Sequence, residues 1–578
     1  MPTVRFQGDK RAGHNTSRLR IRDNNGVDRE ISIGDVVDIP QADFDRLSNF
    51  LLFTASTDPI VAPPHIDDLF VSGGLGNNGD ILVSQGQSTL PQFRQFMAGL
   101  PFVASHSAHV GGQVNATIAG GTVTDGQTRL SHPVGVDCYD IRLVFQNWQQ
   151  GVAPVGEVSG ANAISIRAGA ESPDGTIVPV FFNGKRDVTI DPDGTAISDP
   201  LPFAASKGDT IWTRTRFTVT AGQTVPATRS AVHGSWPGEA VETGAGTVDR
   251  TLSGTIPTVS GPVTGYGPTA IVGRPRSSLM PPPTVALIGD SFVDGYRDYV
   301  YGGGREGGYL ARYLDAAKVS FLTLGRVSET GQNFAGLATS WRRRQQMSGF
   351  THAYVLYGNN DLYVPRTLAQ IQADLLTIWR FAQARSVKVI AATIPPRSTS
   401  TDNWATTTGQ TTSTGNAVRL QLNAWLRDGS PIDATTGAAA AVGATTNVLR
   451  AGQSNHPLST SSAAPMGYHE LADVMETARD SGIWKVPGRT ATLNTTSGSF
   501  TATLASGTLQ VGDVIFGAGI PANTTVTSIS GTTIGLAFAP TATATGVAVT
   551  TAHTPDGMHP SSGMHALIQA AMPANLIA

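Results

Sequence analysis

From residue 284 onward, apolar runs of strand length alternate with segments of helical spacing. Val285–Ile288, Phe321–Leu324, Ala353–Tyr357 and Val387–Ile394 are apolar runs. Between the last two, the apolar residues of Leu368–Ala384 keep the spacing of one helix face. Strands that alternate with amphipathic helices predict parallel βαβ units, with helices on both faces of the sheet. Further helices are expected at Tyr309–Lys318, Asn416–Arg427 and Gly563–Ala571.

The rest of the chain has the pattern of β structure. In residues 113–282, short apolar stretches recur between turn signals, which predicts a β-sandwich. Asp513 is the sole charged residue of 491–552, a segment rich in Thr, Ala and Gly that predicts a small β insertion. We therefore expect five parts: a small β-rich module at 1–62, a linker or second small module at 63–112, the sandwich at 113–282, an α/β domain at 283–490 and 553–578, and the insertion at 491–552.

Two of the N-terminal segments have helical character. Ala42–Phe53 and Leu90–Leu100 each carry apolar residues at spacings that fit one short helix. We expect a helix at each place, within otherwise β-rich or Gly-rich sequence.

Composition excludes several classes of protein. The 578 residues include 40 Lys and Arg against 43 Asp and Glu, a net charge of −3, which argues against nucleic-acid binding. With one cysteine, Cys138, the chain forms no intramolecular disulfide, and we expect a buried thiol. No apolar run reaches the roughly 18 residues of a membrane span. The first 15 residues are polar, so we expect no signal peptide and synthesis in the cytoplasm of the producing cell.

Three short motifs inside the α/β region carry candidate chemistry. Gly289-Asp290-Ser291 follows the first strand, and Gly358-Asn359-Asn360-Asp361 follows the third. Asp556-Gly557-Met558-His559-Pro560 precedes the last helix. Each alone is an ordinary turn sequence. Because each lies at the end of a strand or before the closing helix, all three are expected to meet at one edge of the sheet.

In their order and residue types, these motifs resemble those of the SGNH (GDSL-type) serine hydrolases. The resemblance covers residues 284–578 and implies a flavodoxin-like α/β domain that hydrolyses carboxylic esters without metal or cofactor. It implies that Ser291 is the nucleophile, that Asp556 and His559 complete the triad, and that Asn360 donates to the oxyanion. The family also uses a backbone N–H after its second strand. Here Gly331 is the candidate by residue type and Ser328 by an ungapped reading of the loop.

Two further features have competing interpretations. Arg397 and Trp404 follow the strand 387–394, where they are expected either to bind a sugar or to belong to a surface loop with Trp404 in the core. His553, His559 and His565 recur every six residues, which suggests a metal site. Their spacing does not match the usual zinc motifs, so we expect no metal.

The other parts suggest a setting for the enzyme. Residues 113–282 resemble the jelly-roll modules fused to some carbohydrate-active SGNH enzymes. Residues 1–62 and 491–552 resemble small β modules of bacteriophage structural proteins, in the insertion through Gly517–Pro521 followed by Thr524–Val526. With no signal peptide expected, this resemblance favours a phage tail or head fibre, or a spike, that removes O-acetyl groups from host surface polysaccharide beside other virion proteins. It also implies that the 1–62 module is a virion anchor.

Some alternatives stay open from the sequence alone. One is a bacterial carbohydrate acetylesterase outside a virion, and another is a structural or receptor-binding protein on an inert hydrolase fold. Virion fibres and spikes are commonly trimers, and the sequence leaves a homotrimer open.

Overall fold

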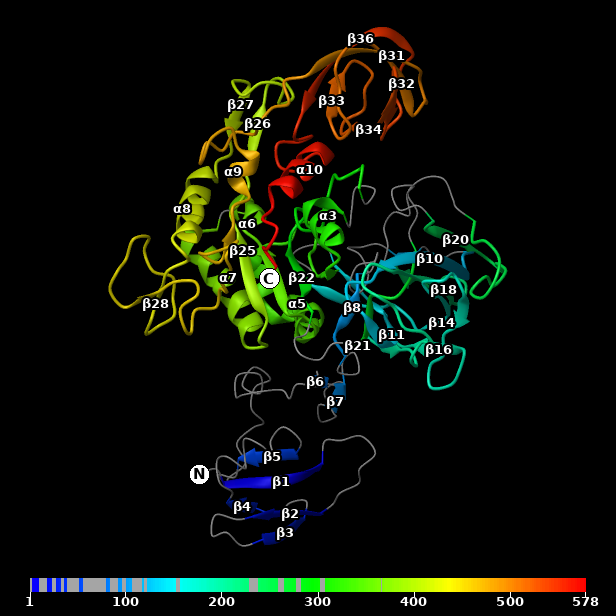
Figure 1. Ribbon diagram of the computed structural model, residues 1–578, viewed down its shortest axis with the longest axis vertical. Coiled ribbons are helices and arrows are strands. Elements are labelled where there is room, and N and C mark those ends of the chain that lie inside the picture. Colours follow the sequence, from blue (N-terminus) through cyan, green and yellow to red (C-terminus); the bar gives the residue numbers. More distant parts are fainter. Residues whose placement is uncertain are drawn as a thin grey trace. The chain divides into compact units, whose positions relative to one another are not determined.

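The computed structural model of the protein describes residues 100–577 apart from 106–116, 119–121, 152–155, 228–237, 258–264, 277–281, 302–306 and 365, together with the backbone of seven strands between residues 3 and 95. The chain divides into two compact units, Met1–Leu100 and Pro101–Ala578. Figure 1 shows the elements of each unit. Most of the expected linker or second small module at 63–112 lies outside the described residues.

The described part of the first unit consists of strands. One three-stranded sheet and two hairpins form it: β4 (Val36–Asp38), β1 (Thr3–Asp9) and β5 (Leu51–Ala55); β2 (Arg18–Arg22) with β3 (Asp28–Ser32); and β6 (Asp80–Val83) with β7 (Gln92–Gln95). The helix expected over 90–100 is wrong, because residues 92–95 pair with β6. Of the helix expected over 42–53, residues 51–53 belong to β5, and the others lie outside the described residues. Cross-strand pairing overrides a short helical spacing here.

A five-stranded parallel sheet forms the centre of the α/β domain. Its order is β23 (Ser320–Thr323), β22 (Thr284–Gly289), β24 (His352–Leu356), β25 (Lys388–Ala392) and β30 (Tyr468–His469). Every residue of β22, β23 and β24 is buried. Continuous burial explains the continuous apolar runs, because helices cover both faces of a parallel sheet.

The helices of this domain match the expected segments. α3 (Gly308–Ala317) packs against α10 (Ser562–Ala571), and α7 (Leu368–Gln383) packs against α8 (Asn416–Arg427). Shorter helices are α4 (Gly331–Ala335), α5 (Leu337–Gln345), η3 (Gln346–Gly349), α6 (Asn359–Tyr363) and α9 (Ala472–Met475). Two hairpins complete the domain: β26 (Ser398–Ser400) with β27 (Gln410–Thr412), and β28 (Ile432–Asp433) with β29 (Val448–Leu449). In the described parts of the chain, no helix is long and apolar enough to cross a membrane.

Two antiparallel sheets form the β domain. One has the order β15 (Ile177–Pro179), β14 (Ile164–Glu171), β18 (Thr210–Thr218), β10 (Asp125–Pro133) and β20 (Ala240–Gly244), with β16 (Asp187–Ile190) also on β14. The other has the order β17 (Thr195–Ile197), β11 (Cys138–Gln146), β21 (Ala270–Pro275) and β8 (Phe102–Ala104). Two short pairs are β12 (Trp148–Gln150) with β13 (Glu157–Ser159), and β9 (Thr117–Ile118) with β19 (Val225–Pro226).

Side chains from both sheets share one core, so the domain is a sandwich. Leu143 of β11 and Ile271 of β21 belong to the same buried cluster as Ile166 of β14 and Phe217 of β18. Cys138 is fully buried in this core, and burial raises the pKa of its thiol to about 12. β8 pairs with β21, so this strand joins the sandwich although it lies in the expected 63–112 segment.

The insertion is a six-stranded antiparallel sheet. Its order is β33 (Val514–Gly517), β36 (Ala544–Ala552), β31 (Thr490–Thr495), β32 (Thr501–Gly507), β35 (Thr533–Leu536) and β34 (Val526–Ser530). Val514 of β33 bridges Thr525 beside β34, so the two edges meet around a core of their own. Meeting edges protect backbone groups that an open sheet would expose. The insertion therefore has its own core, as its separate sequence character suggests.

Candidate active site

Ser291 lies in the turn directly after the central strand β22. Ser291 is 3% exposed, and its backbone carbonyl accepts a hydrogen bond from the Tyr296 N–H at 3.0 Å. The carboxyl ends of parallel strands are where such sheets place ligands, because the chain turns there and leaves a crevice. Ser291 is therefore held at the ligand-binding edge of the sheet.

Ser291, His559 and Asp556 form an unbroken chain of hydrogen bonds. Ser291 Oγ lies 2.9 Å from His559 Nε2, and His559 Nδ1 lies 2.7 Å from Asp556 Oδ2. A carboxylate only accepts, so Nδ1 carries the proton and Nε2 is left to accept from the serine hydroxyl. The Tyr296 ring packs edge-on against the imidazole at a centroid distance of 4.8 Å. The ring is thus held in the tautomer and orientation that a general base needs.

The turn that carries Asp556 depends on Gly557. This residue has a φ of 76°, and an added Cβ would lie 1.9 Å from the Ser398 carbonyl oxygen. The Gly557 carbonyl in turn accepts the Ser398 N–H at 3.0 Å. Only glycine fits this backbone conformation at this distance. The turn is thereby fixed against the loop that follows β25.

Asp556 is prepared to stay ionised. Burial by itself would raise the pKa of its carboxyl, but hydrogen bonds outweigh burial and lower that pKa below its usual range. The bonds come from the His559 ring and from the backbone N–H groups of His559 and Met558, at 2.8 and 3.0 Å for the latter two. Hydrogen bonds to the charged form of an acid favour that form. Asp556 can therefore stabilise an imidazolium at His559.

Asn360 is brought to the same edge by α6. Gly358 before it has a φ of 137°, which lets the chain turn sharply from β24 into α6. Asn360 Nδ2 donates to the Glu329 carbonyl at 3.1 Å and to Asp290 Oδ2 at 3.3 Å. The amide therefore joins the first motif to the loop after β23. Both N–H groups of the amide have an acceptor in this arrangement.

The loop after β23 distinguishes the two candidates for the second backbone donor. Gly331 begins α4, and its N–H already donates to Asp361 Oδ2 at 2.9 Å. Ser328 is exposed and has a φ of 63°, a conformation that usually favours glycine. Within the described residues, no hydrogen bond uses the Ser328 N–H. The geometry therefore favours Ser328 over Gly331 as the remaining donor.

Asp290 is a buried acid next to Ser291. Its carboxyl accepts the Phe292 N–H at 3.0 Å and is 1% exposed. Burial, together with the nearby Asp361 and Glu329 carboxylates, raises the pKa of this carboxyl to about 7, although the Phe292 hydrogen bond acts to lower it. The sequence motif names Asp290, but its burial depends on neighbours distant in the chain. Sequence reasoning gave it no role.

A buried ionic cluster lies behind the Ser328 loop. Arg343 of α5 pairs with Glu329 at 2.8 Å and with Glu157 of the β domain at 2.8 Å. Arg326 pairs with Glu329 at 2.9 Å, and the Tyr357 hydroxyl donates to Glu329 at 2.7 Å. These charged groups are fully buried, and sequence reasoning missed them because their spacing carries no motif. The cluster holds Glu329, whose carbonyl accepts from Asn360.

Arg397 and Trp404 lie next to the turn Asp556–His559, which we call the triad turn. The Arg397 guanidinium stands 4.4 Å from the centroid of the Tyr363 ring. Trp404 is partly buried, and its indole N–H donates to Ser398 Oγ at 3.1 Å. Its ring also packs over Gly557, 2.6 Å from the place of an added Cβ. Trp404 thus supports the triad turn, whereas Arg397 lies at the rim with an exposed tyrosine that sequence reasoning missed.

The other histidines lie apart from the site's chemistry. His553 and His565 are buried, and burial lowers the pKa of each imidazole to about 4. Among the described residues, no group of three or more metal-ligating side chains lies together. The three evenly spaced histidines are therefore not gathered into one cluster.

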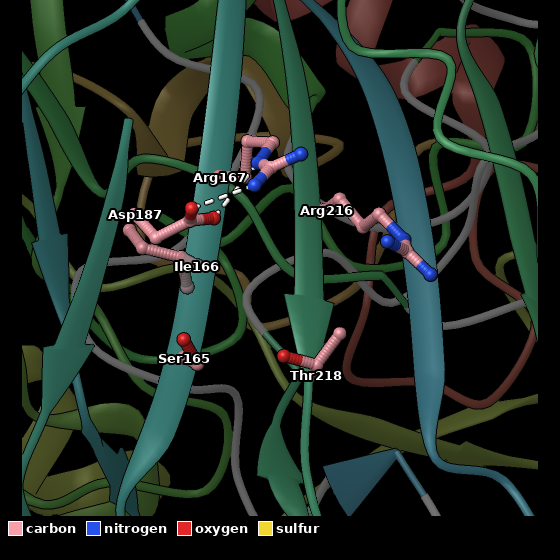
Figure 2. A pocket seen from close by; sticks show the side chains of 6 residues that line it. All are labelled: Ser165, Ile166, Arg167, Asp187, Arg216 and Thr218. Carbon is pink, nitrogen blue, oxygen red and sulfur yellow. Dashed lines mark hydrogen bonds and ion pairs between the residues drawn. The ribbon is translucent and has the colours of Figure 1, made fainter. Parts of the chain in front are cut away.

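One polar hollow of about 280 Å³ lies on the β domain and is lined only by residues of that domain (Figure 2). Arg167 and Arg216 face each other across β14 and β18 at this hollow. Arg167 pairs with Asp187 at 2.6 Å and with Asp249 at 3.1 Å. Arg216 pairs with Asp125 at 3.6 Å, so each of the two arginines at this hollow has a carboxylate partner within the domain.

The insertion stands beside the site's supporting elements. Phe538 of the insertion packs edge-on against Tyr299 at a centroid distance of 5.2 Å, and the Gly563 N–H in the first turn of α10 donates to the Gly512 carbonyl at 2.9 Å. Among the described residues, no hydrogen bond or ring contact joins the insertion to Ser291, Asn360 or His559. The insertion therefore braces α10 and the loop after Ser291.

Comparison with known proteins agrees with this geometry. Residues 287–451 match the GDSL-like Lipase/Acylhydrolase family. The match includes Ser291, Ser328 and Asn360, whereas Asp556 and His559 lie beyond the insertion. Members of this family are serine ester hydrolases. The chain therefore carries a GDSL/SGNH lipase–acylhydrolase domain and is a serine ester hydrolase.

Solved structures with some likeness include three hydrolases or acyltransferases. The esterase EstA from Pseudoalteromonas sp. has 18% sequence identity and a TM-score of 0.16, and the likeness covers 19% of this chain and 60% of that chain. A GDSL-like lipase from Bacteroides thetaiotaomicron has 11% identity and a TM-score of 0.18, with 25% of this chain and 63% of that chain covered. A salicylyl-acyltransferase from a tetracycline biosynthetic pathway has 12% identity and a TM-score of 0.22, with 61% of this chain and 72% of that chain covered. No curated protein matches the sequence.

Proposed function

We propose that Ser291 is the nucleophile of this esterase, that His559 is its general base, and that Asp556 orients and stabilises the imidazole. The observation that carries this assignment is the continuous hydrogen-bonded chain from Ser291 Oγ through both nitrogens of His559 to Asp556. A serine hydroxyl is a weak nucleophile unless an adjacent base removes its proton. Here the base is in hydrogen-bond contact with the hydroxyl.

The reaction begins when Ser291 Oγ attacks the ester carbonyl carbon and its proton passes to His559 Nε2. The carbonyl oxygen becomes negatively charged and is held by the N–H groups of Ser291 and Ser328 and by the Asn360 amide. No hydrogen bond among the described residues uses the first two donors. The 3.3 Å bond from Asn360 to Asp290 is the longer of its two, so the oxyanion replaces that bond. Such donors act strongly because they are already in place.

The leaving alcohol then takes the proton from His559 as the carbon–oxygen bond breaks. A water molecule repeats the sequence on the acyl-enzyme: its proton passes to His559, its oxygen bonds to the acyl carbon, and Ser291 leaves with the proton. The free acid is released. The chain supplies the side chains and the backbone N–H groups for each step, and solvent supplies the water.

We propose that the natural substrate is an O-acetylated polysaccharide of a bacterial surface, which the enzyme deacetylates as part of a phage virion. The support for the polysaccharide is the polar and aromatic rim formed by Arg397 and Tyr363, together with the resemblance of the β domain to modules of carbohydrate-active enzymes. The support for a virion is the resemblance of the 1–62 and 491–552 modules to phage structural proteins. These two finer proposals are independent of the triad assignment.

Hydrolysis of p-nitrophenyl acetate tests the triad directly. We expect the purified protein to hydrolyse this ester and Ser291→Ala to lose at least about a thousandfold in kcat, since the nucleophile is absent. A fluorophosphonate probe should label the parent and spare the variant. The matched control is Ser530→Ala, an exposed serine of the insertion, which should retain parental activity. Equal activity in Ser291→Ala would refute the assignment.

Acetate release tests the substrate. We expect release from O-acetylated capsular polysaccharide or O-antigen at a kcat/KM above that for acetylated xylan or peptidoglycan. The reverse order would favour a bacterial carbohydrate acetylesterase.

Detection of the protein in purified phage particles by mass spectrometry tests the virion proposal separately.

A further inference from the structure

The rim of the active site presents an aromatic ring with a guanidinium on one of its faces. Tyr363 is the last residue of α6 and is 70% exposed. The Arg397 guanidinium carbon lies 4.4 Å from the centroid of this ring. A cation at this distance from an aromatic face is attracted to it. The pair forms one surface, which we call the Tyr363–Arg397 rim.

This rim is attached to both sides of the catalytic machinery. α6 carries Asn360 three residues before Tyr363. Arg397 precedes Ser398, whose N–H donates at 3.0 Å to the carbonyl of Gly557, inside the triad turn. A group bound at the rim therefore lies beside the oxyanion donor on one side and beside the triad turn on the other.

The charge of Arg397 has no carboxylate partner. Within the described residues, no hydrogen bond or ion pair uses its guanidinium, and its one cation–π contact is with the Tyr363 ring. Other arginines of this domain are paired: Arg366 with Asp374 at 2.5 Å and Arg427 with Glu470 at 2.7 Å. The acid that influences Arg397 from nearby is Asp556, whose carboxylate already accepts from the His559 ring. A cation is thus left available at the mouth of the site.

We propose that the Tyr363–Arg397 rim binds a sugar residue that carries a carboxylate, so that the polysaccharide substrate is acidic. The planar guanidinium takes the sugar carboxylate in a pair of parallel hydrogen bonds. The apolar face of the sugar ring packs on the exposed part of the Tyr363 ring. This inference rests on the proposed polysaccharide esterase activity and names the chemistry of its substrate.

Binding is measured first, on the inactive Ser291→Ala protein, so that turnover plays no part. Titration calorimetry compares methyl glucuronoside with methyl glucoside, two sugars that differ in the carboxylate. We expect the acidic sugar to bind about tenfold more tightly, as one charge-assisted pair provides. Raising the salt concentration should reduce this preference. Arg397→Gln in the same background should abolish it.

Three variants make the comparison specific. Arg385→Gln removes another guanidinium that stands over a ring, that of Phe381 at 3.6 Å, at the far end of α7, and should leave the preference unchanged. Tyr363→Ala should weaken binding of both sugars, and Tyr363→Phe should restore it, because the ring face and not the hydroxyl makes the contact. Circular dichroism of each variant checks that it is folded.

Activity supplies the second readout. The ratio of kcat/KM for acetylated methyl glucuronoside to that for acetylated methyl glucoside should be about ten in the parent and about one in Arg397→Gln. Equal binding of the two sugars, or a preference that survives in Arg397→Gln, would overturn the inference. If the protein fails to hydrolyse p-nitrophenyl acetate but still prefers the acidic sugar, the proposed esterase function is refuted. The binding result then still tests whether the Tyr363–Arg397 rim recognises a carboxylate.

Discussion

At the scale of single residues, the site combines one acid that stays ionised with one that resists ionisation. Hydrogen bonds lower the pKa of Asp556, whereas burial raises the pKa of Asp290 to about 7. The two carboxyls of the site thus favour opposite protonation states. Their environments differ because Asp556 accepts hydrogen bonds from the N–H groups of its turn, whereas Asp290 is buried beside other acids.

Asp290→Asn should reveal this difference as a pH dependence of stability. The unfolded carboxyl ionises near pH 3.9 and the folded one near 7, so the parent loses stability as pH rises between these values. In urea unfolding at several pH values, the free energy of unfolding of the variant should rise relative to that of the parent by up to about 4 kcal/mol from pH 4 to 7. Above pH 7 the difference should stay constant. A difference that does not change with pH would contradict this.

At the scale of elements, α10 is seated by a buried neutral histidine. His565 Nδ1 accepts the Tyr309 N–H of α3 at 3.2 Å, and its Nε2 faces the Tyr296 carbonyl at 3.3 Å. The His565 and Tyr309 rings are stacked with centroids 6.0 Å apart. Since one nitrogen accepts and the other donates, the neutral ring satisfies both partners. Burial lowers the pKa of this imidazole to about 4.

His565→Gln should therefore change the acid sensitivity of the protein. An unfolded imidazole takes a proton below pH 6.5 and the folded one only near pH 4, so this residue's contribution to stability is lost as pH falls through that range. Between pH 6.5 and 4, the free energy of unfolding measured in urea should fall by up to about 3 kcal/mol more in the parent than in the variant. The control Leu567→Gln, at an exposed position of the same helix, should keep the parental slope. Equal slopes for all three would disprove the assignment.

At the scale of the whole molecule, the β domain and the α/β domain share a buried ionic cluster. Glu157 of β13 pairs with Arg343 of α5, and Arg343 pairs with Glu329. Glu157 also accepts the Arg342 N–H at 2.7 Å, and Arg326 donates to the Gly151 carbonyl at 2.9 Å. The β domain thus contributes to the support of the loop that holds Ser328 and Glu329.

Glu157→Gln should weaken both the fold and the activity. Without the Glu157 charge, the buried arginines Arg343 and Arg326 share one carboxylate, that of Glu329. The cluster then holds one uncompensated positive charge, which typically costs about 3–5 kcal/mol. We expect kcat for p-nitrophenyl acetate to fall with little change in KM, because the Asn360 acceptor at Glu329 shifts. The control Glu242→Gln breaks a partly exposed pair with Arg250 inside the β domain and should change kcat little. Parental stability and kcat in Glu157→Gln would contradict a shared cluster.

Local sequence signals predicted the elements well where one segment decides its own structure. α8 spans the predicted residues, and α7 and α10 differ from their predictions by one residue at one end. The helix expected over 90–100 failed because pairing with β6, and not local spacing, determines residues 92–95. The candidate backbone donors illustrate the same limit, since the bond between Gly331 and Asp361 is invisible in the motif.

The sequence by itself determined the chemistry: the order Ser291, Asn360, Asp556, His559 and the apolar strands that end beside the first two. Only the tertiary structure decided the geometry that joins Ser291 to His559 across 268 residues, the burial of Asp290, and the link from Glu157 to the Ser328 loop. The physical reason is that residue type and local spacing fix what a group can do. Burial, distance and pKa depend on neighbours that the fold brings from far along the chain.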